Sequence, residues 1–297
     1  MLKTVSGVAR LNFLTLTLLC VLLALAYSLA AGVSVQLLPF IVVSVIALAA
    51  HASVNAFNEY FDFRSGLDFL TPKTPFSGGS GTLIRAPEKA RWALTFAWIT
   101  LGLVVLGGLF LVSEHGWPLL WIGVPGVIII YSYTQYINRL PIICLVAPGI
   151  GFGLLMTLGA IWVFQGSLNI GAWALAIVVS LLVSNLLLLN QFPDADADRK
   201  VGRRTLPIVL GKERSAVVFA LQYGLAMALH LIAIAVAWLP APTIIALLSL
   251  PILIKLVPGV YNNKGSVIKL TPFLGLNVIF IHLYLLLLVA GLIWAWW

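Results

Sequence analysis

Two short clusters hold six of the nine acidic residues in this chain, and their spacing is typical of metal ligands. On a helix, residues four apart share one face, so Asn58 and Asp62 are expected to point together. The same spacing joins Asn190, Asp194 and Asp198. Neighbouring carboxylates repel, and a hard cation with oxygen ligands would relieve that repulsion. The predicted metal ligands are Asn58, Asp62, Asp68, Asn190, Asp194 and Asp198.

The two clusters are related as an internal repeat. The pattern Asn-x-x-x-Asp occurs at Asn58 and Asp62 and again at Asn190 and Asp194, which are 190 − 58 = 132 residues further on. The repeat favours two carboxylate sets that face one cavity, with metal ions bridging a polyanion between them. A solvated acidic loop is the alternative for either cluster taken alone.

The second cluster also invites comparison with a calcium-binding EF-hand loop, but it does not fit one. Arg199 stands where that loop needs glycine, and Thr205 stands where it needs glutamate. Asp196 is two residues out of phase with its acidic neighbours, so it is expected to face solvent or cap a turn.

Basic residues follow both clusters, and the combination is what a site for Mg²⁺ and a diphosphate requires. Carboxylates hold the metal, while guanidinium and ammonium groups hold phosphate oxygens. Contact with anionic lipid is the alternative role for any one of these cations. Glycines in the segment 71–81 either let backbone N–H groups approach an anion or make a plain flexible connector. The predicted diphosphate contacts are Asn58, Arg64, Lys73, Arg139, Lys200 and Arg204.

The composition places these motifs in a membrane protein. Of the 297 residues, 62% are hydrophobic and only 9% are charged, whereas a soluble domain carries roughly 25% charged residues. The mean hydropathy is +1.10. This excludes a soluble, disordered or nucleic-acid-binding protein and predicts a chain that is solvated by the lipid bilayer.

Apolar runs of about 20 residues predict an all-α, polytopic fold with nine transmembrane helices and one domain over 1–297. The predicted spans are Leu11–Ala31, Leu38–Phe57, Leu94–Val112, Leu119–Tyr136, Cys144–Phe164, Ile170–Gln191, Ala216–Leu239, Thr243–Val257 and Phe273–Trp297. With the N-terminus in the cytoplasm, all 17 lysines and arginines fall on or snorkel to the cytoplasmic side, as the positive-inside rule demands. Both acidic motifs then lie on that side. This argues against an inverted-repeat transporter, whose equivalent elements point to opposite sides.

Nine spans with acidic motifs after the second and the sixth resemble the UbiA superfamily of intramembrane prenyltransferases. The first motif, Asn55-x-x-Asn58-Glu59-Tyr60-x-Asp62-x-x-x-Gly66-x-Asp68, is similar to that of the menaquinone-type (1,4-dihydroxy-2-naphthoate) branch, with Glu59 where aspartate is usual. The second, Asn190-x-x-x-Asp194-x-x-x-Asp198-x-x-x-Gly202-Arg203-x-Thr205-Leu206, matches the superfamily pattern, with Arg203 where lysine is common.

The resemblance implies Mg²⁺-dependent transfer of a prenyl group from a polyprenyl diphosphate to a small aromatic acceptor, such as 1,4-dihydroxy-2-naphthoate or 4-hydroxybenzoate. It implies catalytic roles for Asp62, Asp194 and Arg203, in a bacterial or archaeal-type cell membrane. The segment 131–141 is only loosely similar to the Tyr- and basic-rich stretch of the family. The alternatives are a prenyl-diphosphate enzyme with a non-aromatic acceptor, an intramembrane terpene cyclase, and a transporter.

Overall fold

A computed structural model describes residues 2–297, with side chains from residue 4 onward, and all regular secondary structure in this part is helical. The apolar runs are long and charges are scarce. Backbone N–H and C=O groups in such surroundings have no water to bond to, so they form hydrogen bonds within helices. The main helices are α1 Leu2–Ala9, α2 Leu14–Ala30, α3 Leu37–Arg64, α4 Leu67–Leu70, α5 Thr82–Arg85, α6 Ala90–His115, α7 Leu120–Ser132, α8 Pro141–Gly149, α9 Leu158–Gln165, α10 Ile170–Lys200, α11 Leu206–Val209, α12 Gly211–Ala235, α13 Leu250–Asn263 and α14 Val267–Trp296.

Within the described residues, eight helical segments are long and apolar enough to cross a membrane. They are Leu11–Ala30, Leu37–Arg64, Pro87–His115, Pro141–Gln165, Ile170–Lys200, Gly211–Ala235, Ala241–Asn263 and Val267–Trp296. The predicted span Leu119–Tyr136 corresponds to a shorter apolar helix, Trp117–Ser132. Pro118 lies in its first turn and Pro125 lies inside it. The eighth predicted span is longer than the sequence indicated, since the helix continues to Asn263.

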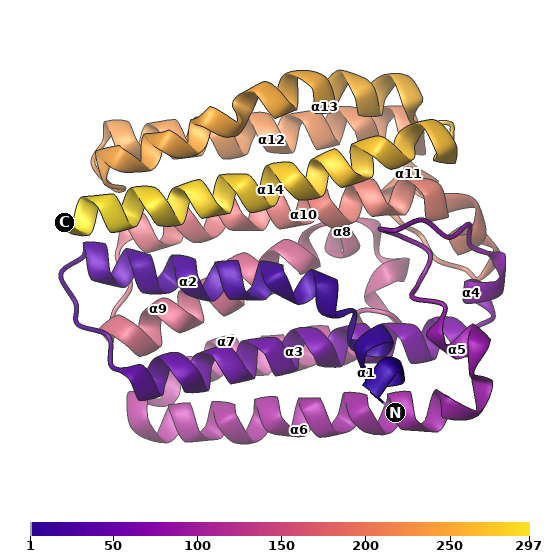
Figure 1. Ribbon diagram of the computed structural model, residues 1–297, viewed down its shortest axis with the longest axis horizontal. Coiled ribbons are helices and arrows are strands. Elements are labelled where there is room, and N and C mark those ends of the chain that lie inside the picture. Colours follow the sequence, from indigo (N-terminus) through magenta and orange to yellow (C-terminus); the bar gives the residue numbers. More distant parts are fainter. Residues whose placement is uncertain (1) are drawn as a thin grey trace.

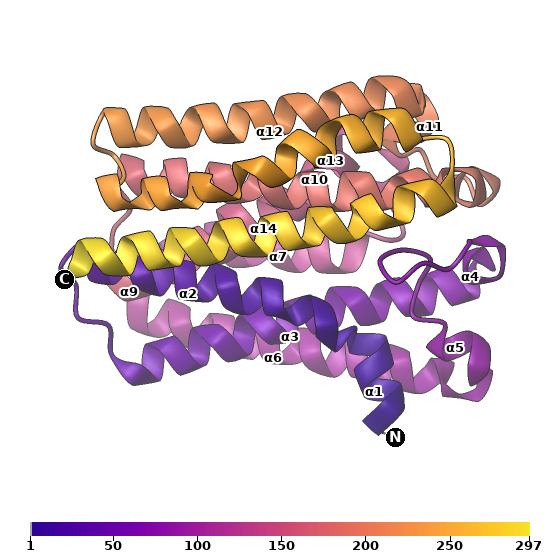
Figure 2. The same ribbon diagram turned by 45° about the horizontal axis from the view of Figure 1, so that its top comes forward.

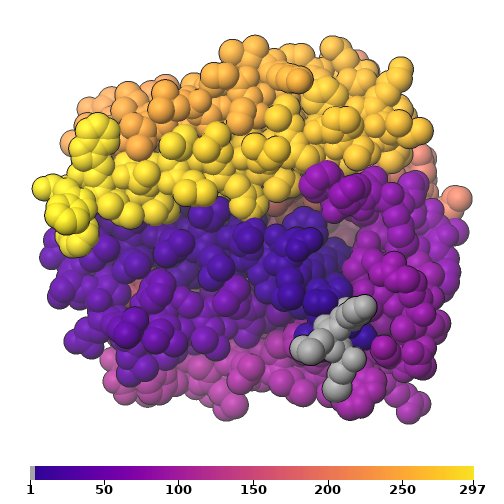
Figure 3. Space-filling model, viewed as in Figure 1, coloured from indigo at the N-terminus to yellow at the C-terminus, as the bar shows by residue number. Residues whose placement is uncertain are grey.

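The long helices lie roughly alongside one another, and α10 is the most deeply buried of the candidate spans. Helix α12 lies on one side of α10, and α3 and α6 lie on the other (Figures 1 and 2), while α14 lies in front of α10 in Figure 1. The surface of α14, in yellow, meets the surface of α2, in indigo, across the face of the molecule drawn in Figure 3.

Small residues let α10 approach the end of α8 and the segment that follows it. A Cβ atom at Gly149 or Gly153 would meet the backbone of α10 at Ser180. Glycines four apart are a common way for membrane helices to pack closely. Between α8 and α9 the backbone forms a π-helix, Ile150–Thr157, a wider turn that often occurs at functional sites.

Two glycines end the helices that carry the acidic motifs. Gly66 follows α3 with a φ of 79°, and Gly202 follows α10 with a φ of 80°. This left-handed conformation is easy for glycine and caps a helix by reversing the chain. Both turns lie at the end of the molecule that holds α1, α4, α5 and α11 (Figure 1).

Candidate active site

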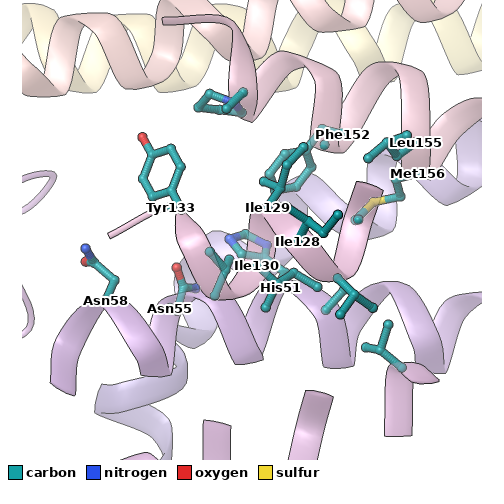
Figure 4. A pocket seen from close by; sticks show the side chains of 18 of the residues that line it. His51, Asn55, Asn58, Ile128, Ile129, Ile130, Tyr133, Phe152, Leu155 and Met156 are labelled. Carbon is teal, nitrogen blue, oxygen red and sulfur yellow. The ribbon is translucent and has the colours of Figure 1, made fainter. Parts of the chain in front are cut away.

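A cavity of about 640 Å³ runs between the helices, and it has a polar and an apolar part. The polar part contains both acidic motifs. The apolar part is lined by side chains from α3, α6, α7, the π-helix and α9. In the close view, Asn55, Asn58 and Tyr133 lie on one side, and Phe152 and neighbouring apolar side chains lie on the other (Figure 4). A molecule that joins a long hydrocarbon chain to a polyanion is divided in the same way, into an apolar part and a charged part.

Arg203 joins the two acidic motifs. Its guanidinium group forms an ion pair with Asp62 on α3 and donates a second hydrogen bond to Asp198 on α10 at 3.0 Å. Burial lowers the pKa of Arg203, but the two carboxylates outweigh it, so the pKa is raised above its ordinary value. Arg203 therefore carries a full positive charge between the motifs.

The turn at Gly202 places Arg203 in this position. After the turn, the Arg203 backbone N–H donates to the Asp198 carbonyl at 3.0 Å, which folds the side chain back over the end of α10. Asp62 and Asp198 each precede the helix-ending glycine by four residues. They are 198 − 62 = 136 residues apart. This separation exceeds the 132-residue offset of the sequence repeat by four residues, which is about one helical turn.

Arg10 completes the first motif from the N-terminal segment. It donates to Asn58 Oδ1 at 3.0 Å and pairs with Glu59 at 3.2 Å. Asn58 in turn donates to Asp62 Oδ2 at 3.0 Å. Glu59 is fully buried and accepts the Ser80 backbone N–H at 3.1 Å. Through these contacts Glu59 connects the N-terminal segment and the loop after α4 to the first acidic motif.

The glycine-containing loop closes over the remaining carboxylates. Asp194 faces the Ser77 side chain and the Gly78 backbone, and a Cβ atom at Gly79 would collide with the Asp68 carboxylate. The φ of Gly79 is 73°, so both the space and the backbone conformation require glycine here. Lys73 is exposed, and its Nζ donates to the Gly78 carbonyl at 3.3 Å.

Asp68 is a buried carboxyl group in a negative environment. Burial, followed by the charges of Glu59 and Asp62, raises its pKa from 3.8 to about 7. Its Oδ2 atom and the Oδ1 atom of Asp194 are buried without a hydrogen-bond partner. Unsatisfied buried carboxylate oxygens are costly, so this end of the cavity favours a cationic ligand.

The donor chemistry of the site fits a hard divalent cation. Carboxylate and amide oxygens are the ligands that Mg²⁺ takes. Within the described residues, no three His, Cys, Asp or Glu side chains converge on one point, and Arg203 lies between Asp62 and Asp198. A metal held by both motifs therefore requires Arg203 to turn toward another anion. The six predicted metal ligands all line the cavity: Asn58, Asp62, Asp68, Asn190, Asp194 and Asp198.

Comparison with known proteins assigns the chain to a family. The model of the UbiA prenyltransferase family matches residues 17–266, which is more than half of the chain. The chain belongs to the UbiA prenyltransferase family. It is therefore a prenyltransferase, and the resemblance drawn from the two motifs is confirmed.

Two curated relatives and one solved structure are similar to this UbiA prenyltransferase over most of their length. It is 29% identical over 237 residues to 1,4-dihydroxy-2-naphthoate octaprenyltransferase of Bacillus subtilis, covering 78% of this chain and 74% of that protein. It is 28% identical over 232 residues to digeranylgeranylglyceryl phosphate synthase of Natronomonas pharaonis, covering 76% and 73%. A UbiA homolog from Archaeoglobus fulgidus, solved with DMAPP and Mg²⁺, superposes with a TM-score of 0.62 at 14% identity, over 96% of this chain and 99% of that one, which shows a shared fold.

Five of the six predicted diphosphate contacts are not among the residues that line the cavity of this UbiA prenyltransferase. Their side chains are exposed: Arg64, Lys73, Arg139, Lys200 and Arg204. The two cations among the lining residues are Arg10 and Arg203. Arg10 was not predicted, because a basic residue before the first span reads as a topology signal and its partner, Asn58, is 48 residues away.

Proposed function

We propose that this UbiA prenyltransferase transfers a prenyl group from a polyprenyl diphosphate to a small aromatic acceptor in an Mg²⁺-dependent reaction. The observation that carries the proposal is one cavity with two different parts. Four aspartates and two cations lie at its polar end, and an apolar passage extends between the helices. The Bacillus subtilis relative supports an aromatic acceptor of the 1,4-dihydroxy-2-naphthoate type.

The residues of the two motifs would hold the diphosphate end. Asp62, Asp68, Asp194 and Asp198, with Asn58 and Asn190, would hold Mg²⁺ through their oxygen atoms. When bound, Mg²⁺ neutralises negative charge that develops on the departing diphosphate. Arg203, released from its carboxylate partners, would bind a diphosphate oxygen in a charge-assisted hydrogen bond. Lys73 lies in the loop nearest to this end and is a further candidate.

The bond changes follow from the substrate. The bond between prenyl C1 and the diphosphate oxygen breaks, and its electron pair stays with diphosphate. A ring carbon of the acceptor then bonds to C1, and loss of the ring proton restores aromaticity. Apolar side chains around the prenyl chain exclude water, which would otherwise attack the allylic cation.

The wider assignments are part of the same proposal. The shorter helix Trp117–Ser132 would complete nine spans, within one domain over 1–297. The one-sided distribution of lysines and arginines supports a cytoplasmic N-terminus and a cytoplasmic mouth of the active site, in a bacterial or archaeal-type cell membrane.

A second acceptor class has specific support, because a relative is named digeranylgeranylglyceryl phosphate synthase. The test is incubation of purified protein with geranylgeranyl diphosphate, Mg²⁺ and one acceptor at a time, followed by mass spectrometry. The acceptors are 1,4-dihydroxy-2-naphthoate, 4-hydroxybenzoate and geranylgeranylglyceryl phosphate. A prenylated aromatic product supports the proposal, and a product from the glycerol lipid alone contradicts it.

A further inference from the structure

A groove between α12 and α13 lies apart from the active-site cavity. Its volume is about 680 Å³, and among the described residues the two linings have no member in common. Helices α12 and α13 run side by side at the edge of the molecule that is opposite α6 (Figures 1 and 2). Apolar side chains of both helices line most of the groove, and Tyr261 and Asn262 line one end of it.

A row of small residues on α12 leaves room for this groove. Ala216, Ala220, Gly224 and Ala228 are spaced by four, so they share one face of the helix, and all of them line the groove. Such rows usually let a second helix pack closely. Here a Cβ atom at Gly224 would meet nothing within 4 Å beyond the backbone of its own helix. The row therefore faces open space, although α13 runs beside it.

The groove has about the length of one leaflet of a bilayer. Its α12 side runs from Ala216 to Ala228, which is 228 − 216 = 12 residues. A helix rises 1.5 Å per residue, so this side is about 18 Å long, close to the ~15 Å that one leaflet contributes to a ~30 Å hydrocarbon core. Leu221 and Leu225, also in the lining, are 65% and 58% exposed, so the groove opens to the surface that lipid would cover. Its shape thus suits an acyl chain.

The polar end of the groove lies at the same end of the molecule as the acidic motifs. The Tyr261 hydroxyl donates to Glu213 Oε1 at 2.8 Å, which connects α13 to the start of α12. Lys264 Nζ donates to the Tyr261 carbonyl at 2.8 Å and lies 4.0 Å from the centroid of the Tyr261 ring. This end, which we call the mouth, is therefore polar and carries a cation.

Two further cations lie on the groove faces of the helices without a carboxylate partner. Arg214 precedes Val217 on α12 by three residues, and Lys255 precedes Pro258 on α13 by three, so each shares a face with a lining residue. Among the described residues, no carboxylate oxygen lies within 4.0 Å of either cationic group. Lys255 is exposed within the candidate span Ala241–Asn263. Charged side chains in spans are costly and generally have a partner.

The charge around the mouth favours an anionic occupant. Arg214, Lys255 and Lys264 outnumber the one acidic residue there, Glu213. Basic residues near a membrane surface attract anionic lipids. A second copy of the chain, packed here across a twofold axis, would bring the same cations together, and they would repel. An anionic lipid is therefore favoured over self-association.

We propose that the groove between α12 and α13 binds one acyl chain of an anionic phospholipid, with the lipid phosphate held by Arg214 and Lys255. The long side chains of these residues can extend toward the mouth from its two walls while their stems cover apolar surface. A lipid bound in this way contacts α12 and α13 at once and holds them together. The site is independent of prenyl transfer, since it takes neither substrate.

The test is native mass spectrometry of the purified protein with dioleoyl phosphatidylglycerol or dioleoyl phosphatidylcholine, two lipids with the same chains. The anionic lipid should bind about tenfold more tightly, equivalent to about 1.4 kcal/mol. The double substitution Arg214→Gln and Lys255→Gln should reduce its affinity to that of phosphatidylcholine. Gly224→Leu fills the groove, so it should weaken binding of both lipids at least about tenfold.

Two substitutions near or on α6 are matched controls. A Cβ atom at Gly102 also meets nothing within 4 Å beyond its own helix, and Gly102 lies in neither lining, so Gly102→Leu controls for Gly224→Leu. Lys89 is exposed, and Lys89→Gln controls for the loss of charge. Both controls should leave the two lipid affinities unchanged.

Three results would overturn the site. They are equal wild-type affinities for the two lipids, an affinity for phosphatidylglycerol that Gly224→Leu does not change, and a dimer that Gly224→Leu dissociates, which would show a contact between two copies. Thermal unfolding without added lipid checks that each variant is folded. If Gly224→Leu does not fold, the double charge substitution decides, and an unchanged affinity for phosphatidylglycerol refutes the proposal.

Discussion

Replacing Arg203 with glutamine should destabilise the protein when no divalent cation is present. Arg203 is the buried partner of both Asp62 and Asp198. Removing one partner of a buried ion pair costs about 3–5 kcal/mol, because the remaining charge is uncompensated. Since two carboxylates share this arginine, the loss in the free energy of unfolding should lie in the upper half of that range.

Mg²⁺ should reverse much of this loss. The two freed carboxylates would bind the cation in the folded state. A ligand present at a concentration of 100 times its Kd raises the free energy of unfolding by about 2.7 kcal/mol. Thermal unfolding in detergent, with EDTA and across an Mg²⁺ titration, measures both effects. Lys212→Gln is the control: its Nζ lies 3.9 Å from Asp196, which is 82% exposed, so the change should be only about 0–1 kcal/mol. A variant as stable as wild type in EDTA, or insensitive to Mg²⁺, would refute the reasoning.

Three more outcomes are expected. Asp194→Asn should lower prenyl transfer about 100-fold or more across an Mg²⁺ titration, while Asp196→Asn, at an exposed position, should keep near-normal activity; equal losses would contradict the assignment of the metal face. Gly126→Leu should disfavour geranylgeranyl relative to dimethylallyl diphosphate in competition assays, because the new side chain narrows the passage beside Leu155; unchanged selectivity would contradict this. With the Asp68 pKa raised from 3.8 to about 7, stability in EDTA should fall as pH rises from about 4 to 7, because the folded state keeps a proton that the unfolded chain releases, and Mg²⁺ affinity should rise. Asp68→Asn should make both pH profiles shallower, and profiles that stay unchanged would exclude Asp68 as a source of them.

Hydropathy and helical periodicity predict much of the architecture, because both are local properties of the chain. Apolar runs indicate the all-helical fold, and spacing by four places Asn58 and Asp62 on one face. The same phase argument puts Asp196 outside the cavity, and the structure shows it exposed. The short helix Trp117–Ser132 is harder to assign, since its prolines interrupt an otherwise apolar run.

Contacts between distant segments are what the sequence does not reveal. The pairing of Arg203 with Asp62 spans 141 residues and depends on the chain reversal at Gly202. Helical phase no longer applies beyond such a turn, so the sequence cannot distinguish Arg203, which turns inward, from Arg204, which is exposed. Arg10 reaches the site only because α1 packs against α3.

The most direct test of the central claim is the binding of a non-hydrolysable geranylgeranyl diphosphate analogue to the purified protein in lipid nanodiscs, measured with and without Mg²⁺. If the two acidic motifs hold the diphosphate through the metal, binding should be strong only with Mg²⁺. Asp62→Asn and Asp198→Asn should each weaken it by at least about tenfold, equivalent to about 1.4 kcal/mol. Tight binding in EDTA that neither substitution alters would contradict the account.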